Sequence, residues 1–378
     1  MALSKITNSS VTDSTLTTTK LATPNLGRRN LVINGAMQVA QRGTSQTGIT
    51  SSGYHTVDRV KLLAGSAGTY TTSQVADSPS GQGFYFSYKL DCTTSDTYSG
   101  SGDDLLIRMG SLEQQDCLKF NYGGSSAEKL TLSFWAKFSY ADTFNVALIN
   151  HVAQRSNFKP FTISSADTWQ KITITYDGDT NSGDGFANST ALGLSIDLWL
   201  GGGSNFSGGS ATSGVWDERS NNNTSLSAAS TKFGTSTDHE LFITGIQLEV
   251  NSQATPFEHR SYGDELARCQ RYYQTWGGND PYEHLPFYVL GNGTVANFNW
   301  GLPVEMRVAP SLSTSGTWSI QGPYGGSVYT VGSFVLANTS TKTIRGDAQS
   351  LSGSIGTNTA RVFAINSTTV RFNLDAEL

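Results

Sequence analysis

Residues 130–138 read LTLSFWAKF, and this stretch decides the fold class. Apolar residues occupy every second position from Leu130 to Phe138, and successive side chains of a β-strand point to opposite faces of its sheet. The alternation therefore predicts a strand with one buried face. The stretch LGLSIDLWL at residues 192–200 repeats the pattern, which indicates two strands that pack into a common core.

Working outward, strand-like runs alternate with turn clusters from residue 28 to about 260. The further runs are 84–90, 144–149, 171–176 and 241–250. Glycine-, asparagine- and serine-rich stretches separate them, such as 177–185 and 201–214. Many short strands punctuated by turns predict an all-β protein with a central β-jelly-roll, a sandwich over residues 28–260, rather than βαβ units.

The C-terminal part predicts one short helix and a second β domain. SYGDELARCQRYYQTW at 261–276 suits a helix, because Ser261 and Asp264 form a capping pattern and Gly277 follows. We therefore expect this stretch to be helical and residues 261–278 to form a connecting helix between the domains. Residues 279–378 resume strand patterning as a small C-terminal β domain, predicted to be distal. Its expected strands are 328–336, 361–365, 370–374 and, between two prolines, an edge strand at 303–310.

Residues 1–27 differ from the rest. They are rich in serine and threonine, and their isolated apolar residues are about five positions apart: Leu3, Ile6, Val11, Leu16 and Leu21. This spacing suits neither an amphipathic helix nor a free-standing strand. The segment cannot bury enough surface alone, so we expect an extended arm that orders against a partner through those residues.

Composition and charge exclude several classes of protein. Only 15% of the 378 residues are charged and the net charge is −5, which excludes a basic nucleic-acid binder. The N-terminus lacks the apolar region of a signal peptide, and no run approaches the roughly 20 apolar residues of a membrane span. The three cysteines predict buried thiols in a reducing cytoplasm, without disulfides: Cys92, Cys117 and Cys269.

Four stretches carry a resemblance to a known family. They are RRNLVINGAMQVAQRG at 28–43, GYHTVDRV at 53–60, the long run 241–276 and DAEL at 375–378. Together they resemble tail-fibre and receptor-binding proteins of tailed bacteriophages common in marine phages, including cyanophages, in which a jelly-roll precedes a distal domain. The resemblance implies a structural virion protein, assembled in the host bacterial cytoplasm, that forms a homotrimer. It also implies attachment to other phage tail or capsid proteins through residues 1–27 and binding of host surface glycan.

Alternation along the strands places the candidate glycan-binding residues. Trp135 and Lys137 share the polar face of 130–138, and Asp197 and Trp199 share that of 192–200. An aromatic ring beside a charged group suits a sugar face, but the same rings could be covered by the arm, the distal domain or another subunit. In the distal domain, Tyr324 on the loop 321–327 is a further candidate.

No cofactor is expected, and no metal site beyond one weak calcium candidate. The loop 177–185 places Asp177, Asp179, Asn181 and Asp184 in the opening pattern of a calcium loop, but Asn188 stands where the bidentate glutamate belongs, so a polar turn is favoured. The charged residues around the predicted helix suggest a hinge network of ion pairs: Glu258, His259, Arg260, Arg268 and Arg271.

Enzymatic chemistry finds little support, and no catalytic residue is predicted. The five histidines are scattered and lie in no nucleophile or metal-ligand motif. A polysaccharide depolymerase would need a carboxylate pair, for which Asp103, Asp104, Glu218 and Glu283 are available. It would also be expected to carry the short repeats of a long β-helix, which are absent. The main alternative to a tail fibre is a capsid or neck decoration protein, such as a head fibre.

Overall fold

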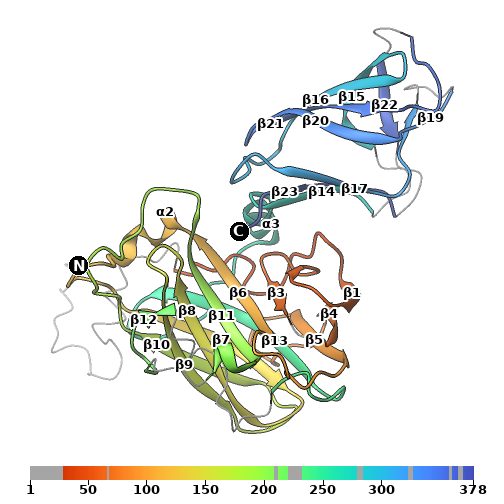
Figure 1. Ribbon diagram of the computed structural model, residues 1–378. Coiled ribbons are helices and arrows are strands. Elements are labelled where there is room, and N and C mark those ends of the chain that lie inside the picture. Colours follow the sequence, from red (N-terminus) through yellow and green to blue (C-terminus); the bar gives the residue numbers. More distant parts are fainter. Residues whose placement is uncertain are drawn as a thin grey trace, which may run out of the picture.

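The computed structural model describes residues 29–65, 68–207, 212–219, 232–278, 284–321, 327–356, 360–364 and 369–378. Over these residues the chain forms a large antiparallel β-sandwich followed by a smaller β domain (Figure 1). The predicted all-β class is confirmed. The five predicted arm residues (Leu3, Ile6, Val11, Leu16, Leu21), together with Tyr324 and Glu283, lie outside the described residues.

Two sheets form the sandwich. Sheet A has the order β1 (Ser45–Ile49), β4 (Thr69–Val75), β5 (Ser87–Thr94), β13 (Glu240–Val250), β7 (Leu130–Phe138), β10 (Gln170–Tyr176). Sheet B has the order β12 (Asp217–Glu218), β9 (Arg155–Ile163), β8 (Asp142–Asn150), β11 (Leu192–Gly202), β6 (Asp104–Glu113), β3 (Lys61–Ala64), β2 (Gly53–Tyr54). Short helical turns interrupt the connections: α2 (Gln114–Cys117), η2 (Leu118–Phe120) and η3 (Ser204–Phe206).

The predicted apolar faces of β7 and β11 meet in one core between the two sheets. Phe134 of β7 and Ile196 of β11 are both fully buried there, as the alternation predicts. Most other apolar positions of the two sheets are buried in the same layer, so the sandwich is held by a continuous aliphatic and aromatic interior. Cys92, Cys117 and Cys269 are buried free thiols, as expected.

A bulge in β13 explains two of the glycines in the resemblance motifs. Gly245 has φ +64°, and the pairing of β13 with β7 shifts register between Thr244 and Gln247. The bulge turns the Ile246 amide toward the 29–43 segment, where it donates to the Gly35 carbonyl at 2.9 Å. A side chain at Gly35 would meet the Ile246 carbonyl, so only glycine allows this close approach.

Two further sheets form the C-terminal domain and share one core (Figure 1). Sheet C has the order β14 (Tyr273–Gly277), β23 (Arg371–Asp375), β17 (Ser311–Ser315). Sheet D has the order β19 (Tyr329–Thr330), β18 (Ser319–Gln321), β22 (Ala360–Ala364), β15 (His284–Asn292), β16 (Val295–Gly301), β21 (Thr343–Gln349), β20 (Ser333–Thr339). The Trp276 and Trp300 rings, 4.0 Å apart, are part of the interior between them.

The connecting helix is shorter than predicted. The helix α3 covers Tyr262–Gln270, and its N-cap Ser261 accepts a hydrogen bond from the Asp264 amide, as the capping pattern predicts. The prediction that the helix continues to residue 276 is wrong. Residues 273–277 form β14 instead, because their aromatic and β-branched side chains suit a strand and β23 offers a pairing edge.

The predicted edge strand at 303–310 is also wrong. These residues form bends without ladder pairing. From this segment Arg307 donates to the carbonyls of Ala376 (2.8 Å), Glu377 (2.8 Å) and Thr190 (3.0 Å), so the segment ties the C-terminal residues to the sandwich. The two prolines that bracket it, Pro303 and Pro310, withhold the amide donors that a ladder needs.

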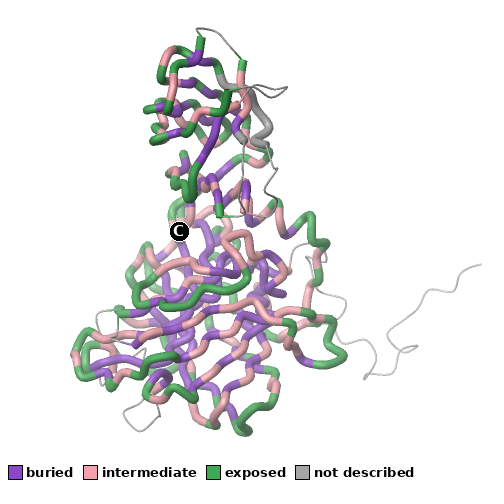
Figure 2. Tube along the Cα trace, turned by 90° about the vertical axis from the view of Figure 1, so that its right-hand side faces the viewer, coloured by how far each residue is buried: buried purple, intermediate pink, exposed green. Residues whose placement is uncertain are grey.

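The four resemblance motifs meet at the junction between the two domains. Figure 2 shows this junction as the waist between two lobes, with residue 378 beside it. Glu113 of β6 is fully buried there and accepts both donors of Arg271 at 2.8 Å and the Tyr272 hydroxyl at 2.7 Å. Arg59 pairs with Glu377, and Arg42 contacts Asp375 at 3.2 Å. These motif residues therefore hold the two domains together.

Three members of the predicted hinge network, Glu258, Arg260 and Arg271, form buried or half-buried ion pairs around α3, whereas Arg268 pairs only within the helix. Arg260 pairs with Glu258 at 3.3 Å and with Glu265 at 2.8 Å, while Arg271 pairs with Glu113. Arg268 pairs with Asp264 one helical turn away. His259 is different: it is exposed and its ring packs against Phe84 and Phe257 instead. Among the described residues, no helix is both long enough and apolar enough to cross a membrane.

Candidate functional site

The two predicted tryptophan–charge pairs lie on opposite outer faces of the sandwich. Trp135 and Lys137 are on β7 of sheet A, and Asp197 and Trp199 are on β11 of sheet B. Side chains on the outer faces of two stacked sheets point away from each other. The structure therefore does not bring the two pairs together, and each has to be judged by its own surroundings.

The sheet B pair is closed to ligands. Trp199 is only 6% exposed and packs against Phe206, in a small apolar cluster that covers this face. Asp197 is 2% exposed and accepts two hydrogen bonds from Arg108 at 2.8 and 2.9 Å. A carboxylate held in this bidentate way has no need of a ligand. The prediction that Asp197 and Trp199 face a glycan is thus wrong, because both side chains are buried.

The titratable residue next to this pair, His151, is also enclosed by the fold. His151 lies beside this pair, with its Nε2 2.8 Å from the Ser195 hydroxyl. Burial, together with the positive charge of Arg108, lowers the pKa of His151 to about 4, so the ring is neutral at physiological pH. This outer face of sheet B is consequently a packed polar and apolar layer of the fold.

The sheet A pair borders a half-exposed aromatic surface. Phe242 of β13 stands opposite Lys89 of β5 on one side and opposite Lys137 of β7 on the other. Its neighbours Leu241 and Ile243 are fully buried, so Phe242 points outward. Trp169, just before β10, extends the row beyond Lys137. We refer to Lys89, Phe242, Lys137, Trp169 and the adjoining Asp77 as the sheet A platform.

Asp77 fixes the side chains of the platform. Its carboxylate accepts from Lys137 Nζ at 2.5 Å and from the Trp169 indole N–H at 3.1 Å. Partial burial opposes ionisation, but these hydrogen bonds outweigh it and lower the pKa of Asp77. The Lys137 ammonium lies 4.2 Å from the centre of the Phe242 ring. One carboxylate thus positions a cation and two aromatic rings side by side.

Trp135 lies beside the platform, one row along the sheet. It stands opposite Thr244 of β13 and Lys171 of β10, and it is half-buried. The bulge at Gly245 makes room for Phe84 on its other side, because a Cβ at Gly245 would lie 2.6 Å from Phe84 Cζ and 3.1 Å from Trp135 Cδ1. Of the candidates named from sequence, Lys137 is therefore at the centre of the platform and Trp135 at its border.

Four platform residues were missed by sequence reasoning. Phe242 could have been found, since 241–250 alternates and places it opposite the buried Leu241 and Ile243. Trp169 precedes a predicted strand and gives no outward signal. Lys89 and Asp77 become part of the platform only through the order of the strands in sheet A, because β5, β13 and β7 are neighbours in the sheet but distant in sequence. The sequence does not reveal this order.

The calcium candidate loop is tied by basic side chains. Arg155 Nε contacts Asp179 at 3.1 Å and Asp184 at 2.9 Å, while Asp177 pairs with Lys129 at 2.6 Å. Asn181 donates to Asp184. A guanidinium thus stands between the two buried carboxylates, as expected of a polar turn. Among the described residues, no three His, Cys, Asp or Glu side chains are grouped so as to hold a metal ion.

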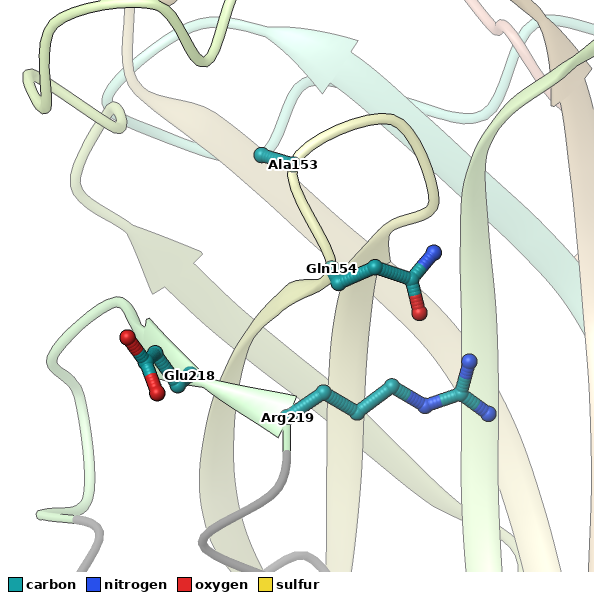
Figure 3. A pocket seen from close by; sticks show the side chains of 4 residues that line it. All are labelled: Ala153, Gln154, Glu218 and Arg219. Carbon is teal, nitrogen blue, oxygen red and sulfur yellow. The ribbon is translucent and has the colours of Figure 1, made fainter.

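Two pockets lie beside β12. One, of about 570 Å³, is lined by the calcium candidate loop and by residues 214–216. The other, of about 560 Å³, is lined by Ala153, Gln154, Glu218 and Arg219. Figure 3 shows Glu218 pointing away from Gln154 and Arg219, so these polar groups do not converge on one point. The first pocket has one aromatic lining residue, Trp216, which is only 7% exposed, and the second is lined by none, so neither offers the row of aromatic rings found on the platform.

Two of the candidate carboxylates of a glycosidase, Asp104 and Glu218, are far apart. Asp104 is aligned with Gly202 at one end of β11, whereas Glu218 is aligned through β9 and β8 with Leu194 near the other end. Eight strand residues separate the two positions, or about 25 Å. A catalytic pair of carboxyl groups needs a separation of about 5 to 10 Å. Asp103 instead caps the Gly100 amide at 2.7 Å.

Comparison with known proteins gives distant likenesses only. No protein-family model and no curated protein matches the chain. Similar solved structures include the enzymatically active domain of bacteriophage CBA120 tailspike protein 4 (10% identity, 59% of this chain and 21% of that one, TM-score 0.29). They also include a family 11 carbohydrate-binding module from Clostridium thermocellum in complex with a β-1,3-1,4-mixed-linked tetrasaccharide (11% identity, 56% of this chain and 98% of that one, TM-score 0.27). A third is TmCBM61 in complex with β-1,4-galactotriose (8% identity, 59% of this chain and 99% of that one, TM-score 0.28).

Proposed function

We propose that the protein is a non-catalytic adhesin that binds glycan through the sheet A platform. The observation that carries the proposal is the Phe242–Lys137–Trp169 row, with the Lys137 ammonium 4.2 Å from the Phe242 ring centre and Asp77 bonded to both Lys137 and Trp169. It combines apolar rings with fixed donors and acceptors on a half-exposed sheet face.

This arrangement suits a sugar ring on physical grounds. One face of a pyranose carries C–H groups, which pack against the negative face of an aromatic ring. The hydroxyl groups at its rim need donors and acceptors held in place, which Lys137 and Asp77 provide. Both remain within reach of solvent, since the side chains of Lys137 and Asp77 are 16% and 41% exposed. The rings are already ordered by packing, so little further entropy is lost on binding.

The biological setting proposed for this binding is a phage virion. The resemblance motifs imply a tail fibre, and residues 1–27 have the composition of a docking arm. In a homotrimer, three platforms would be linked, so weak binding at each site becomes strong attachment through high effective concentration. A head-fibre or neck protein would dock elsewhere. Antibody labelling of residues 1–27 in intact virions distinguishes the two positions, tail or capsid.

Replacing the platform rings tests glycan binding. We expect Phe242→Ala and Trp169→Ala each to weaken adsorption to host cells, and to polysaccharide extracted from their envelope, by about tenfold or more, equivalent to about 1.4 kcal/mol. Tyr262→Ala is the matched control, because it removes an aromatic side chain that is 57% exposed on α3. Circular dichroism and light scattering check that each variant keeps its fold and its oligomeric mass.

The proposal fails if the two platform variants bind as the wild type does. It also fails if they lose oligomeric mass while glycan binding per subunit is kept, since the platform would then be a contact between subunits. The non-catalytic part has its own test: incubation should leave the chain length of the bound polysaccharide unchanged in gel filtration. Shortened products would show a depolymerase.

A further inference from the structure

Each platform cation is already matched by a carboxylate of this chain. Lys137 pairs with Asp77 at 2.5 Å, and Lys89, on the other side of Phe242, pairs with Glu240 at 2.6 Å. The strand register produces the second pair, because β13 places Glu240 two residues before Phe242, on the same outward face. The aromatic ring therefore lies between two closed ion pairs.

The surrounding residues keep this balance. Asp91 stands opposite Glu240 on β5, and the exposed Lys171 stands opposite Trp135 on β10. At and next to the platform, the described ammonium groups therefore equal the carboxylates in number: Lys89, Lys137 and Lys171 against Asp77, Asp91 and Glu240. Burial and the nearby Glu240 carboxylate raise the pKa of Asp91, against the attraction of Lys89. A further negative charge is thus unfavourable at this place.

An acidic sugar meets two obstacles at the platform. Its carboxylate could reach Lys137 or Lys89 only by displacing Asp77 or Glu240 from bonds of 2.5 and 2.6 Å. The displaced carboxylates would stay nearby and repel the ligand. At longer range the net charge of −5 also disfavours the approach of polyanions. A neutral sugar meets neither obstacle, because its hydroxyl groups can bond to the ion pairs without breaking them.

We propose that the platform selects uncharged glycans and discriminates against uronic-acid and other acidic polymers, with binding that depends little on ionic strength. This inference rests on the proposed glycan-binding function and adds the chemical class of the ligand. Screening weakens attraction between charged partners. For a neutral ligand on closed ion pairs there is no such attraction to lose.

The first test uses the full chain and matched pairs of polymers. Immobilised neutral polysaccharides (a β-glucan, a galactan and a mannan) are compared with the same polymers after oxidation of their primary alcohols to carboxylates. We expect at least one neutral polymer to be bound at both low and high salt, and its oxidised counterpart about tenfold less tightly. Equal or tighter binding of the oxidised polymer overturns the inference while leaving the proposed function intact.

Failure of the proposed function looks different. If no neutral polymer is bound, the inference falls. If the host envelope polysaccharide is not bound either, the adhesin proposal falls with it. If the envelope polysaccharide is bound but the binding disappears at high salt, only the neutral-ligand inference is overturned.

Opening one ion pair provides a gain-of-function test. Asp77→Asn releases Lys137, and Glu240→Gln releases Lys89 on the other side of Phe242. We expect either variant to bind the oxidised polymers several-fold more tightly than the wild type at low salt, and to lose that gain at high salt. Asp177→Asn is the matched control, because it makes the same charge change and releases Lys129 on an exposed ion pair in another part of the chain.

Two variants keep this test decisive. If Asp77→Asn melts at a much lower temperature than the wild type, Glu240→Gln replaces it, since Glu240 does not bond to Trp169. A gain of the same size in Asp177→Asn would mean that net charge alone controls binding, and would overturn the inference. So would the absence of any gain in a folded Asp77→Asn or Glu240→Gln variant.

Discussion

The Arg59 guanidinium stacks on the Tyr272 ring, with its carbon 3.5 Å from the ring centre. Arg59 belongs to the VDRV motif near the start of the sandwich and Tyr272 follows the helix α3, so the contact joins distant parts of the chain. Arg59 also pairs with Glu377 and donates to the Ser111 carbonyl at 2.9 Å. One buried side chain thereby contacts the sandwich, the connecting segment and the C-terminal residues.

Removing Arg59 should uncouple the domains. Arg59→Ala removes the closer of the two arginines that pair with the buried Glu377 and leaves only Arg42, 3.4 Å away. Breaking a buried pair costs up to about 3 to 5 kcal/mol of unfolding free energy. Chemical denaturation measures this loss, and we expect the C-terminal domain to become sensitive to protease before the sandwich. Arg268→Ala is the control, because the pair of Arg268 with Asp264 is on the exposed face of α3. Losing this pair should lower the unfolding free energy by less than about 0.5 kcal/mol. Similar losses in both variants would contradict a special role for Arg59.

Asp58 should give the junction a dependence on pH. It is fully buried, and this burial, opposed by Arg42, raises its pKa from 3.8 to about 6. A carboxyl group with a raised pKa holds its proton more tightly in the folded state. Its contribution to stability is therefore complete below pH 3.8 and is lost as the pH rises through about 6.

The measurement compares the wild type with Asp58→Asn. We expect the wild-type unfolding free energy, minus that of the variant, to fall by roughly 3 kcal/mol as the pH rises across this interval. Subtraction removes the contributions of the other carboxylates. A difference that is flat, or that rises with pH, would show that Arg42 and Gln41 stabilise the ionised form more than burial opposes it.

Gly245 should be irreplaceable at the β13 bulge. Its φ of +64° disfavours any side chain, and an added Cβ would meet Phe84 and Trp135. We expect Gly245→Ala to lower the unfolding free energy by about 1 to 3 kcal/mol and to change the tryptophan fluorescence. Gly263→Ala is the opposite case, since Gly263 lies in α3 with open space around it. This substitution should raise the unfolding free energy by up to about 1 kcal/mol. A harmless Gly245→Ala would refute the close packing of Phe84 over the bulge.

Local patterns predicted the strands with strict alternation, missed others such as β6 and β9, and said little about the surroundings of the side chains. The alternation of 130–138 marked β7 to the residue, because burial on one face imposes a period of two. The same alternation placed Trp199 on an outer face but could not show that Phe206 covers it. Coverage depends on how the turn η3, directly after β11, folds back over the sheet, and the alternation within the strand carries no record of that.

The helix and the platform show two other limits. Residues 273–276 continued the helical pattern in sequence, but pairing with β23, about a hundred residues later, made Tyr273–Gly277 a strand. The platform needs Lys89, Lys137 and Phe242 in one row, and this row exists only because β5, β13 and β7 are adjacent. Strand order is a property of the whole fold. The sequence could therefore indicate individual platform residues, such as Lys137, but not that they lie next to one another.

The attachment of residues 29–43 has a mechanical consequence. This segment is hydrogen-bonded to Ile246, to Glu258 and, through Asn34, to Glu265 of α3. A pulling force applied at residue 29 is therefore resisted by many hydrogen bonds loaded together, rather than one at a time. The force reaches the connecting helix before it reaches the outer strands of either sheet. Tension at this end is therefore passed directly to the residues that connect the sandwich with the C-terminal domain.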